Sequence, residues 1–86
     1  MSPPDLSAWQ FTAYFRTMRQ RPDRASIAMD WILQTASAPE YQRKQADGRY
    51  QCWRRIHEAE NRWLRVVLLT DGKTIHNAFF DRGFKP

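Results

Sequence analysis

The sequence predicts a single α+β domain in which one main helix, with room for a second short one before it, packs on a twisted antiparallel sheet of three to five strands. Three observations predict it: a length of 86 residues, helical apolar spacing in the first half and alternating apolar residues in the second. This length leaves room for one core only. A composition of 42% hydrophobic and 27% charged residues is typical of a folded domain.

The N-terminal stretch contains two patterns. Residues 1–8 include two prolines and no apolar period, which predicts a flexible arm before a single domain at residues 9–86. Over residues 9–15 apolar and polar positions alternate, which favours a strand. A short strand that turns into a helix near Ala13 is the competing interpretation, because Phe15 and Met18 also sit at helical spacing.

The main helix is expected after the break at residues 21–23. Either Asp23 or Ser26 could cap its first turn, and Pro39 is expected to end it. Its buried face is predicted from i, i+3, i+4, i+7 spacing to be Ala28, Trp31, Ile32 and Thr35.

Three strands are expected in the second half, at residues 48–56, 62–69 and 73–80. Asp-Gly pairs near the start of the first and third are typical of tight turns, and short hairpins make neighbouring strands antiparallel. In the middle strand Leu64, Val66 and Leu68 alternate with Trp63, Arg65 and Val67. One sheet face should therefore pack on the core while the other presents aromatic rings beside arginine, although a one-residue slip would exchange the faces.

The charge is positive, local and dominated by arginine. The net charge is +5, and 11 of the 14 basic residues are arginine. Residues 16–24 contribute +3 and residues 41–65 contribute +4, so the remainder sums to −2. Arginine binds phosphate through its planar fork and stacks on flat rings, which favours a polyanionic partner. An ordinary solvated face, with arginine stems covering apolar surface, is the alternative.

Several function classes lack support in the sequence. Cys52 is the only cysteine, which excludes an internal disulfide and a thiolate zinc site within this chain and suits a reducing cytoplasm. We expect it to be buried filler rather than a nucleophile. There is no glycine-rich phosphate loop and no paired-histidine spacing, so no cofactor or metal is expected. The longest apolar run, residues 66–69, is too short to span a bilayer.

Three residues are candidates for catalysis. The ordinary pKa of a histidine side chain lies near neutrality, so His76, with Asn77 beside it, could act as general acid or base. Arg65 and Arg82 could stabilise the charge of a phosphate in the transition state. A structural histidine, and an ion pair of Arg65 with Asp81 or Asp47, are the competing interpretations.

A second group of residues could bind single-stranded nucleic acid. Arg49, Arg54 and Arg55 would hold the phosphate backbone, while Trp53 would stack a base. We expect the guanidinium groups and this indole to meet in one positively charged hollow, on the side of the sheet opposite the helix.

The segments DGR, WRRI, LRVVL, DGKT and HNAFFDR, at residues 47–49, 53–56, 64–68, 71–74 and 76–82, resemble a family of small uncharacterised bacterial proteins. More distantly, the order of elements resembles the RelE/ParE superfamily of toxin folds, which is likened to barnase, EndoU and colicin nucleases. That resemblance implies a RelE-like fold, metal-independent cleavage of single-stranded RNA, and an acidic antitoxin as partner. By position it would place Arg65, His76 and Arg82 on the active surface.

Other functions stay open. The chain lacks the clustered lysines and late tyrosine that many RelE-like toxins use. A non-catalytic protein-interaction module and a nucleic-acid binder without cleavage are the alternatives, and a homodimer is compatible with so short a chain.

Overall fold

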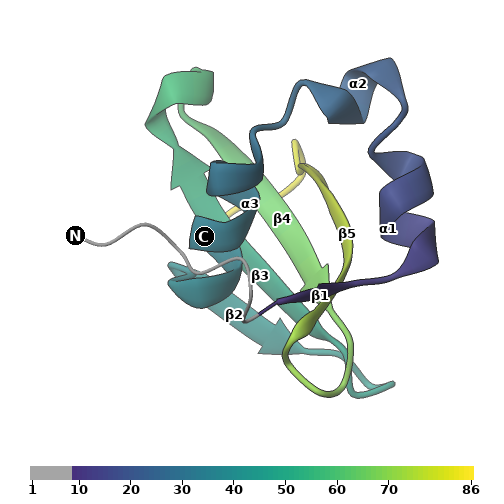
Figure 1. Cartoon of the computed structure of the whole chain (residues 1–86). Helices are drawn as coiled ribbons and strands as arrows, with labels where there is room; N and C mark the ends of the chain where they lie inside the picture. The colour runs from purple at the N-terminus through teal and green to yellow at the C-terminus, as the bar shows by residue number, and fades with distance from the viewer. Residues whose placement is uncertain (1–8) are drawn as a thin grey trace.

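The structure of this chain is a computed structural model that describes residues 9–86. The predicted N-terminal arm, residues 1–8, lies outside the described residues. In chain order the elements are β1 (Gln10–Phe11), α1 (Ala13–Met18), α2 (Pro22–Ala25), α3 (Met29–Ser37), β2 (Tyr41–Lys44), β3 (Tyr50–Ile56), the 3₁₀ turn η2 (His57–Ala59), β4 (Arg62–Leu68) and β5 (Thr74–Phe80) (Figure 1). Within residues 9–86, no helix combines the length and apolar character that crossing a membrane requires.

The five strands form one sheet in the order β1-β5-β4-β3-β2. The neighbours from β2 to β5 are antiparallel, and β1 pairs with β5 in parallel. The α+β class is therefore confirmed, with a mixed sheet rather than an entirely antiparallel one. The parallel pair arises because the chain passes through all three helices and three strands before it returns beside β1.

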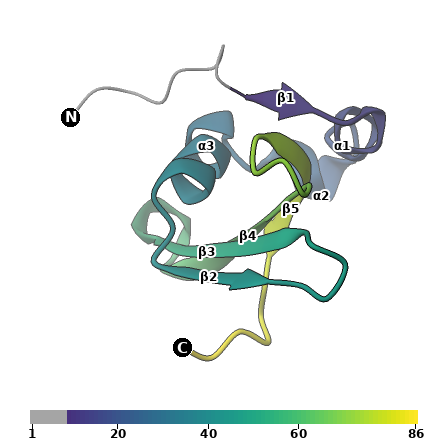
Figure 2. The same ribbon diagram turned by 90° about the horizontal axis from the view of Figure 1, so that it is seen from below.

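The helices all lie on one side of the sheet, and residues 81–86 lie on the other side (Figure 2). Helix α3 packs across β3 and β4, while α1 packs against β5. The core between the layers includes Phe15, Ile27, Ile32, Leu33, Leu64, Val66, Leu68 and Ile75, each at most 3% exposed. This packing confirms the predicted core face of the middle strand.

The main helix α3 starts later than the predicted caps imply. Its N-cap is Ala28, which gives no side-chain hydrogen bond, so the prediction of Asp23 or Ser26 as its cap is wrong. Both residues instead belong to the region of α2, which Pro22 opens. Proline suits a first helical position because that residue needs no backbone N–H donor.

The first strand is shorter than the alternation over residues 9–15 predicts. It ends at Phe11, and the hydroxyl of Thr12 accepts a hydrogen bond from the backbone N–H of Phe15 at 3.0 Å, which caps α1. The competing interpretation, a strand that turns into a helix, is confirmed. Strand β2 is not among the predicted strands, because all four of its residues are exposed and give no apolar alternation.

The two Asp-Gly pairs form the expected turns. Gly48 and Gly72 have φ angles of +90° and +68°, a region that favours glycine. A Cβ on Gly48 would lie 2.9 Å from Cγ2 of Thr70, so the β2–β3 turn approaches the β4–β5 turn closely. The carboxylates of Asp47 and Asp71 accept backbone N–H groups within these turns.

Candidate nucleic-acid interface

The sheet face opposite the helices carries aromatic and basic side chains, and we call it the open face. Strand alternation places Trp53 on β3 directly across from Arg65 on β4, and Arg55 across from Trp63. Arg65 is in turn paired with Phe79 on β5. The predicted separation into an apolar core face and a basic aromatic face is therefore present in the sheet.

A cluster of four aromatic rings, centred on Phe84, covers part of the open face. Phe84 stacks on Trp53 with ring centres 4.6 Å apart and planes within 15°. Phe84 also contacts Trp63 edge-on at 5.1 Å and Tyr41 at 5.5 Å. Trp53 is only 5% exposed and so presents little surface to a ligand, whereas Tyr41 is 45% exposed.

A hollow of about 460 Å³, which we call the open-face hollow, opens beside these rings. It is lined by Arg43, Gln51, Trp53, Arg65, Asp81, Gly83, Phe84 and Lys85. Three of these residues are cationic and one is acidic, which gives the lining a formal charge of +2. Within residues 9–86, neither Arg43 nor Lys85 forms an ion pair.

The carboxylate of Asp81 fixes the floor of this hollow. Its Oδ2 atom accepts a hydrogen bond from Nε1 of Trp53 at 3.0 Å and lies 3.6 Å from Nη1 of Arg65. Of the two proposed carboxylate partners for Arg65, Asp81 is the one observed. The Oδ1 atom of Asp81 also accepts the backbone N–H of Gly83, so this residue directs the following chain across the sheet.

The guanidinium group of Arg65 is held between two rings. Its carbon lies 5.5 Å from the ring centre of Trp53 and 5.3 Å from that of Phe79. The Nε atom is buried and has no hydrogen-bond partner in the described chain. Arg65 therefore forms a structural ion pair with Asp81 and also lines the open-face hollow.

The other residues predicted to bind nucleic acid lie apart, so the prediction that the guanidinium groups and the indole of Trp53 all meet in one hollow is wrong. Arg49 is in the β2–β3 turn and pairs with Asp47 at 3.7 Å. Arg54 shares the core-side alternation of β3, and its Nη1 atom donates to the carbonyl of Ala38 at 2.8 Å. Arg55 remains on the open face, with its guanidinium carbon 5.0 Å from the ring centre of Trp63.

His76 lies against α1, at an irregularity in the pairing of β4 with β5. Its Nδ1 atom is 3.1 Å from the hydroxyl oxygen of Thr12, and its ring stacks on Tyr14 at 4.8 Å. Burial lowers the pKa of His76, and the positive charge of Arg49 lowers this pKa further. The neutral imidazole is therefore the favoured form at neutral pH. His76 does not line the hollow on the open face.

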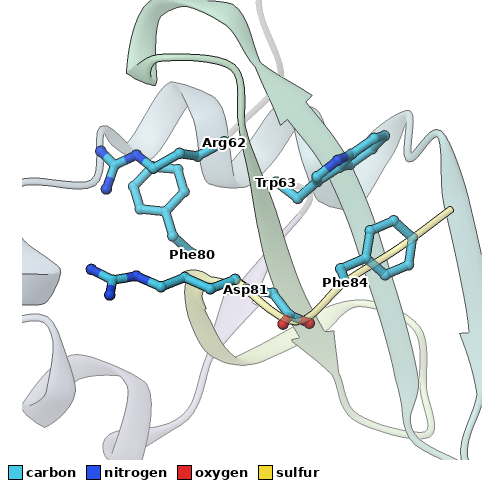
Figure 3. Close-up of a pocket in the computed structure, with 6 residues that line it drawn as sticks. Arg62, Trp63, Phe80, Asp81 and Phe84 are labelled. Carbon is cyan, nitrogen blue, oxygen red and sulfur yellow. The ribbon is translucent and has the colours of Figure 1, made fainter.

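Arg82 is exposed and lines a different hollow of about 260 Å³. This hollow adjoins the open-face hollow, because Asp81 and Phe84 line both. Figure 3 shows the side chains of Trp63 and Phe84 on one side of the 260 Å³ hollow, and those of Arg62 and Phe80 on the other. Of the seven residues singled out from the sequence, Trp53 and Arg65 line the open-face hollow, whereas His76 and Arg82 do not.

Sequence reasoning missed Arg43, Phe84 and Lys85. Arg43 lies on the strand that gave no apolar alternation, and the other two follow the last strand, where no periodic pattern indicates their direction. Cys52 is fully buried, as expected, and burial raises the pKa of its thiol despite a contact from Gln42. Across residues 9–86, no cluster of histidine, cysteine and carboxylate side chains is arranged to hold a metal ion.

No family model matches this chain, and no curated protein or solved structure is significantly similar to it.

Proposed function

We propose that this chain binds single-stranded RNA on the open face of its sheet. The observation that carries the proposal is the hollow lined by Arg43, Arg65, Lys85 and one acidic side chain, with Trp53 and Phe84 of the aromatic cluster in its wall. Cations that follow a backbone and rings that accept bases are the two components of single-strand binding surfaces.

The phosphate backbone would lie over the hollow. Arg43 and Lys85 are exposed and have no ion pair in the described chain, so their charges are available to a ligand. The carboxylate of Asp81 is already engaged by Trp53 and Arg65, which reduces its repulsion of an incoming phosphate. Polyphosphate ligands bind such sites largely by releasing counterions, so the affinity should depend steeply on salt.

The bases would stack on the rings that remain accessible. Tyr41 is 45% exposed and meets Trp63 edge-on at 5.6 Å, so the two rings offer differently oriented surfaces. Stacking of a base on an aromatic side chain contributes about 1–3 kcal/mol and tolerates any base. Because stacking requires splayed bases, these rings favour a single strand over a duplex.

The test compares a basic residue inside the hollow with one outside it. We expect Arg43→Ala to weaken binding of a short fluorescent single-stranded RNA several-fold in an anisotropy titration, because it removes a phosphate contact. Arg16 is an exposed residue of α1, so Arg16→Ala removes the same charge at a place away from the hollow and should weaken RNA binding much less. Equal effects of the two variants would contradict the proposal, as would an absence of binding by the wild-type protein. Single-stranded DNA in parallel measures the preference for RNA.

Cleavage of RNA is a second candidate function, and it would use His76, whose Nδ1 atom lies 3.1 Å from the hydroxyl oxygen of Thr12 and whose ring lies outside the open-face hollow, so the cleaved bond would lie beside α1. A neutral imidazole can take the proton of a ribose 2′-hydroxyl as its oxygen attacks the adjacent phosphorus. The bond to the 5′-oxygen of the next nucleotide then breaks, and that oxygen takes up the proton that the imidazole accepted. The products are a 2′,3′-cyclic phosphate and a free 5′-hydroxyl.

Cleavage is tested in the presence of EDTA, which chelates divalent metal ions and so inhibits contaminating nucleases that depend on them. Wild-type protein should shorten labelled RNA and leave cyclic phosphate ends, while His76→Gln should not. RNA binding that persists without any cleavage would discard this second candidate and leave the binding function intact.

A further inference from the structure

We propose that two adjoining hollows at the end of β5 bind one nucleotide through its base and its terminal phosphate. The first is the hollow of Figure 3, and the second is a hollow of about 280 Å³ lined by Asp23, Arg24, Ile27, Arg62, Phe79, Phe80 and Arg82. We call the first the aromatic hollow and the second the arginine hollow. They share Arg62, Phe80 and Arg82.

The two hollows differ in chemistry. The aromatic hollow is lined by the rings of Trp63, Phe80 and Phe84, which suit a flat heterocycle, and at its edge by Asp81 and the two shared arginines. The arginine hollow contains three guanidinium groups, from Arg24, Arg62 and Arg82, and one carboxylate. An apolar slot beside a cluster of cations matches a ligand that is flat at one end and anionic at the other.

The fold holds two of these arginines in place. Nη1 of Arg24 donates to Oδ1 of Asn77 at 2.9 Å and to the carbonyl of Ala78 at 3.0 Å, which ties α2 to β5. Nε of Arg62 donates to the carbonyl of Ala59 at 3.0 Å, and its guanidinium carbon lies 4.0 Å from the ring centre of Phe80. Positioned guanidinium groups lose less conformational freedom when they bind a phosphate.

Arg82 completes the cluster. It is exposed and forms no ion pair in the described part of the chain, so its guanidinium remains available. The single carboxylate belongs to Asp23, whose side chain is 61% exposed. Its Oδ1 atom lies 3.5 Å from Nε of Arg21, and its Oδ2 atom lies 3.6 Å from Nε of Arg24. Three cations and one carboxylate give the lining of the arginine hollow a formal charge of +2.

This charge favours a terminal phosphate over an internal one. A phosphate monoester carries about −1.5 to −2 at pH 7, whereas each internal diester of a strand carries one negative charge. A monoester therefore balances the arginine hollow more completely. The ligand class is a nucleotide with a terminal phosphate, either free or at the end of a strand.

At the end of an RNA strand, the inference rests on the proposed function, because the strand would continue from these hollows onto the open face. We would measure wild-type binding to three RNAs of one sequence that carry a 5′-phosphate, a 3′-phosphate or only hydroxyl ends. Nucleoside monophosphates and the corresponding nucleosides form separate arms for the free ligand. We expect one phosphorylated strand, or the monophosphates, to bind at least tenfold more tightly than the hydroxyl form.

Arg82→Ala is the decisive variant, because no ion pair or side-chain hydrogen bond of Arg82 within residues 9–86 would be lost and folding should be unaffected. It should abolish the preference for the phosphorylated ligand and leave the affinity for the hydroxyl-ended strand nearly unchanged. Arg43→Ala should weaken binding of the hydroxyl-ended strand and keep the preference for the phosphorylated ligand. Arg16→Ala should change neither that affinity nor that preference. If wild type binds phosphorylated and hydroxyl ligands equally, this inference is overturned while RNA binding stands. If the wild type binds no strand and no monophosphate, both proposals fail.

Discussion

The carboxylate of Asp81 joins three parts of the open face, because it contacts Trp53, Arg65 and the backbone of Gly83. We predict that Asp81→Asn lowers the free energy of unfolding by about 1–3 kcal/mol, the range for loss of a hydrogen-bonded charged group. The asparagine oxygen can still accept from Trp53, so the loss reports mainly on the partly buried Arg65. Urea denaturation followed by tryptophan fluorescence measures it.

The same variant separates a structural from a binding role for this carboxylate. Removing a negative charge from a hollow that holds phosphate should tighten RNA binding, even as the fold becomes less stable. Weaker RNA binding at unchanged stability would show instead that Asp81 contacts the ligand directly.

His76 gives stability a defined pH dependence. Because its folded pKa lies below the ordinary value of 6.5, the unfolded chain binds the proton more tightly. The contribution of this residue is therefore fully present above that value and is lost as pH falls through it toward the folded pKa. We predict that the stability difference between wild type and His76→Gln shifts against the wild type as pH is lowered from about 7.5 to about 5.5.

Thermal melts of both proteins across this pH range measure the effect. A wild type that gains stability relative to His76→Gln on acidification would contradict the assignment of a lowered pKa.

At the scale of elements, α1 depends on one side chain. Thr12 accepts the N–H of Phe15 and contacts His76, so it both caps the helix and ties it to β5. We predict that Thr12→Ala costs about 1 kcal/mol, or about 4–8 °C in Tm for a domain of this size. Thr12→Ser keeps the oxygen and should lose much less, and equal losses from both variants would show that the methyl group rather than the cap matters.

The strands that sequence analysis located are those with a buried face. Alternate positions of β3 and β4 face the core, so their period of two was visible and their predicted bounds differ from the observed ones by at most two residues. Strand β2 is exposed along its whole length, and its pairing with β3 is set by backbone hydrogen bonds, which carry no apolar signal. The start of α3 was misplaced because Pro22 opens a separate helix that ends at Ala25.

The candidate site was less predictable than the strands. Alternation put Trp53 and Arg65 on one face correctly, since the register follows from the core pattern. It could not reveal that Phe84 stacks on Trp53, because the path of residues 81–86 depends on the Asx turn and carboxylate contacts of Asp81. Nor could it place His76, whose position depends on an irregularity in the β4–β5 pairing.

At the scale of the whole molecule, the positive charge is divided among separate places rather than gathered in one hollow. Arg43, Arg65 and Lys85 line the open-face hollow, while Arg24, Arg62 and Arg82 line the arginine hollow. Residues 81–86 border both hollows, because Asp81 and Phe84 line the open-face hollow and Arg82 lines the arginine hollow. This arrangement suits a ligand that extends over several nucleotides.

If phosphates of single-stranded RNA bind over the open-face hollow, the salt dependence of the RNA affinity must change when a cation of that hollow is removed. We would measure log Kobs against log salt concentration for wild type, Arg43→Ala and the control Arg16→Ala. We expect a slope for Arg43→Ala that is smaller in magnitude by roughly 0.7 to 1, the change for one lost phosphate contact, and an unchanged slope for Arg16→Ala. Parallel lines for wild type and Arg43→Ala would contradict it.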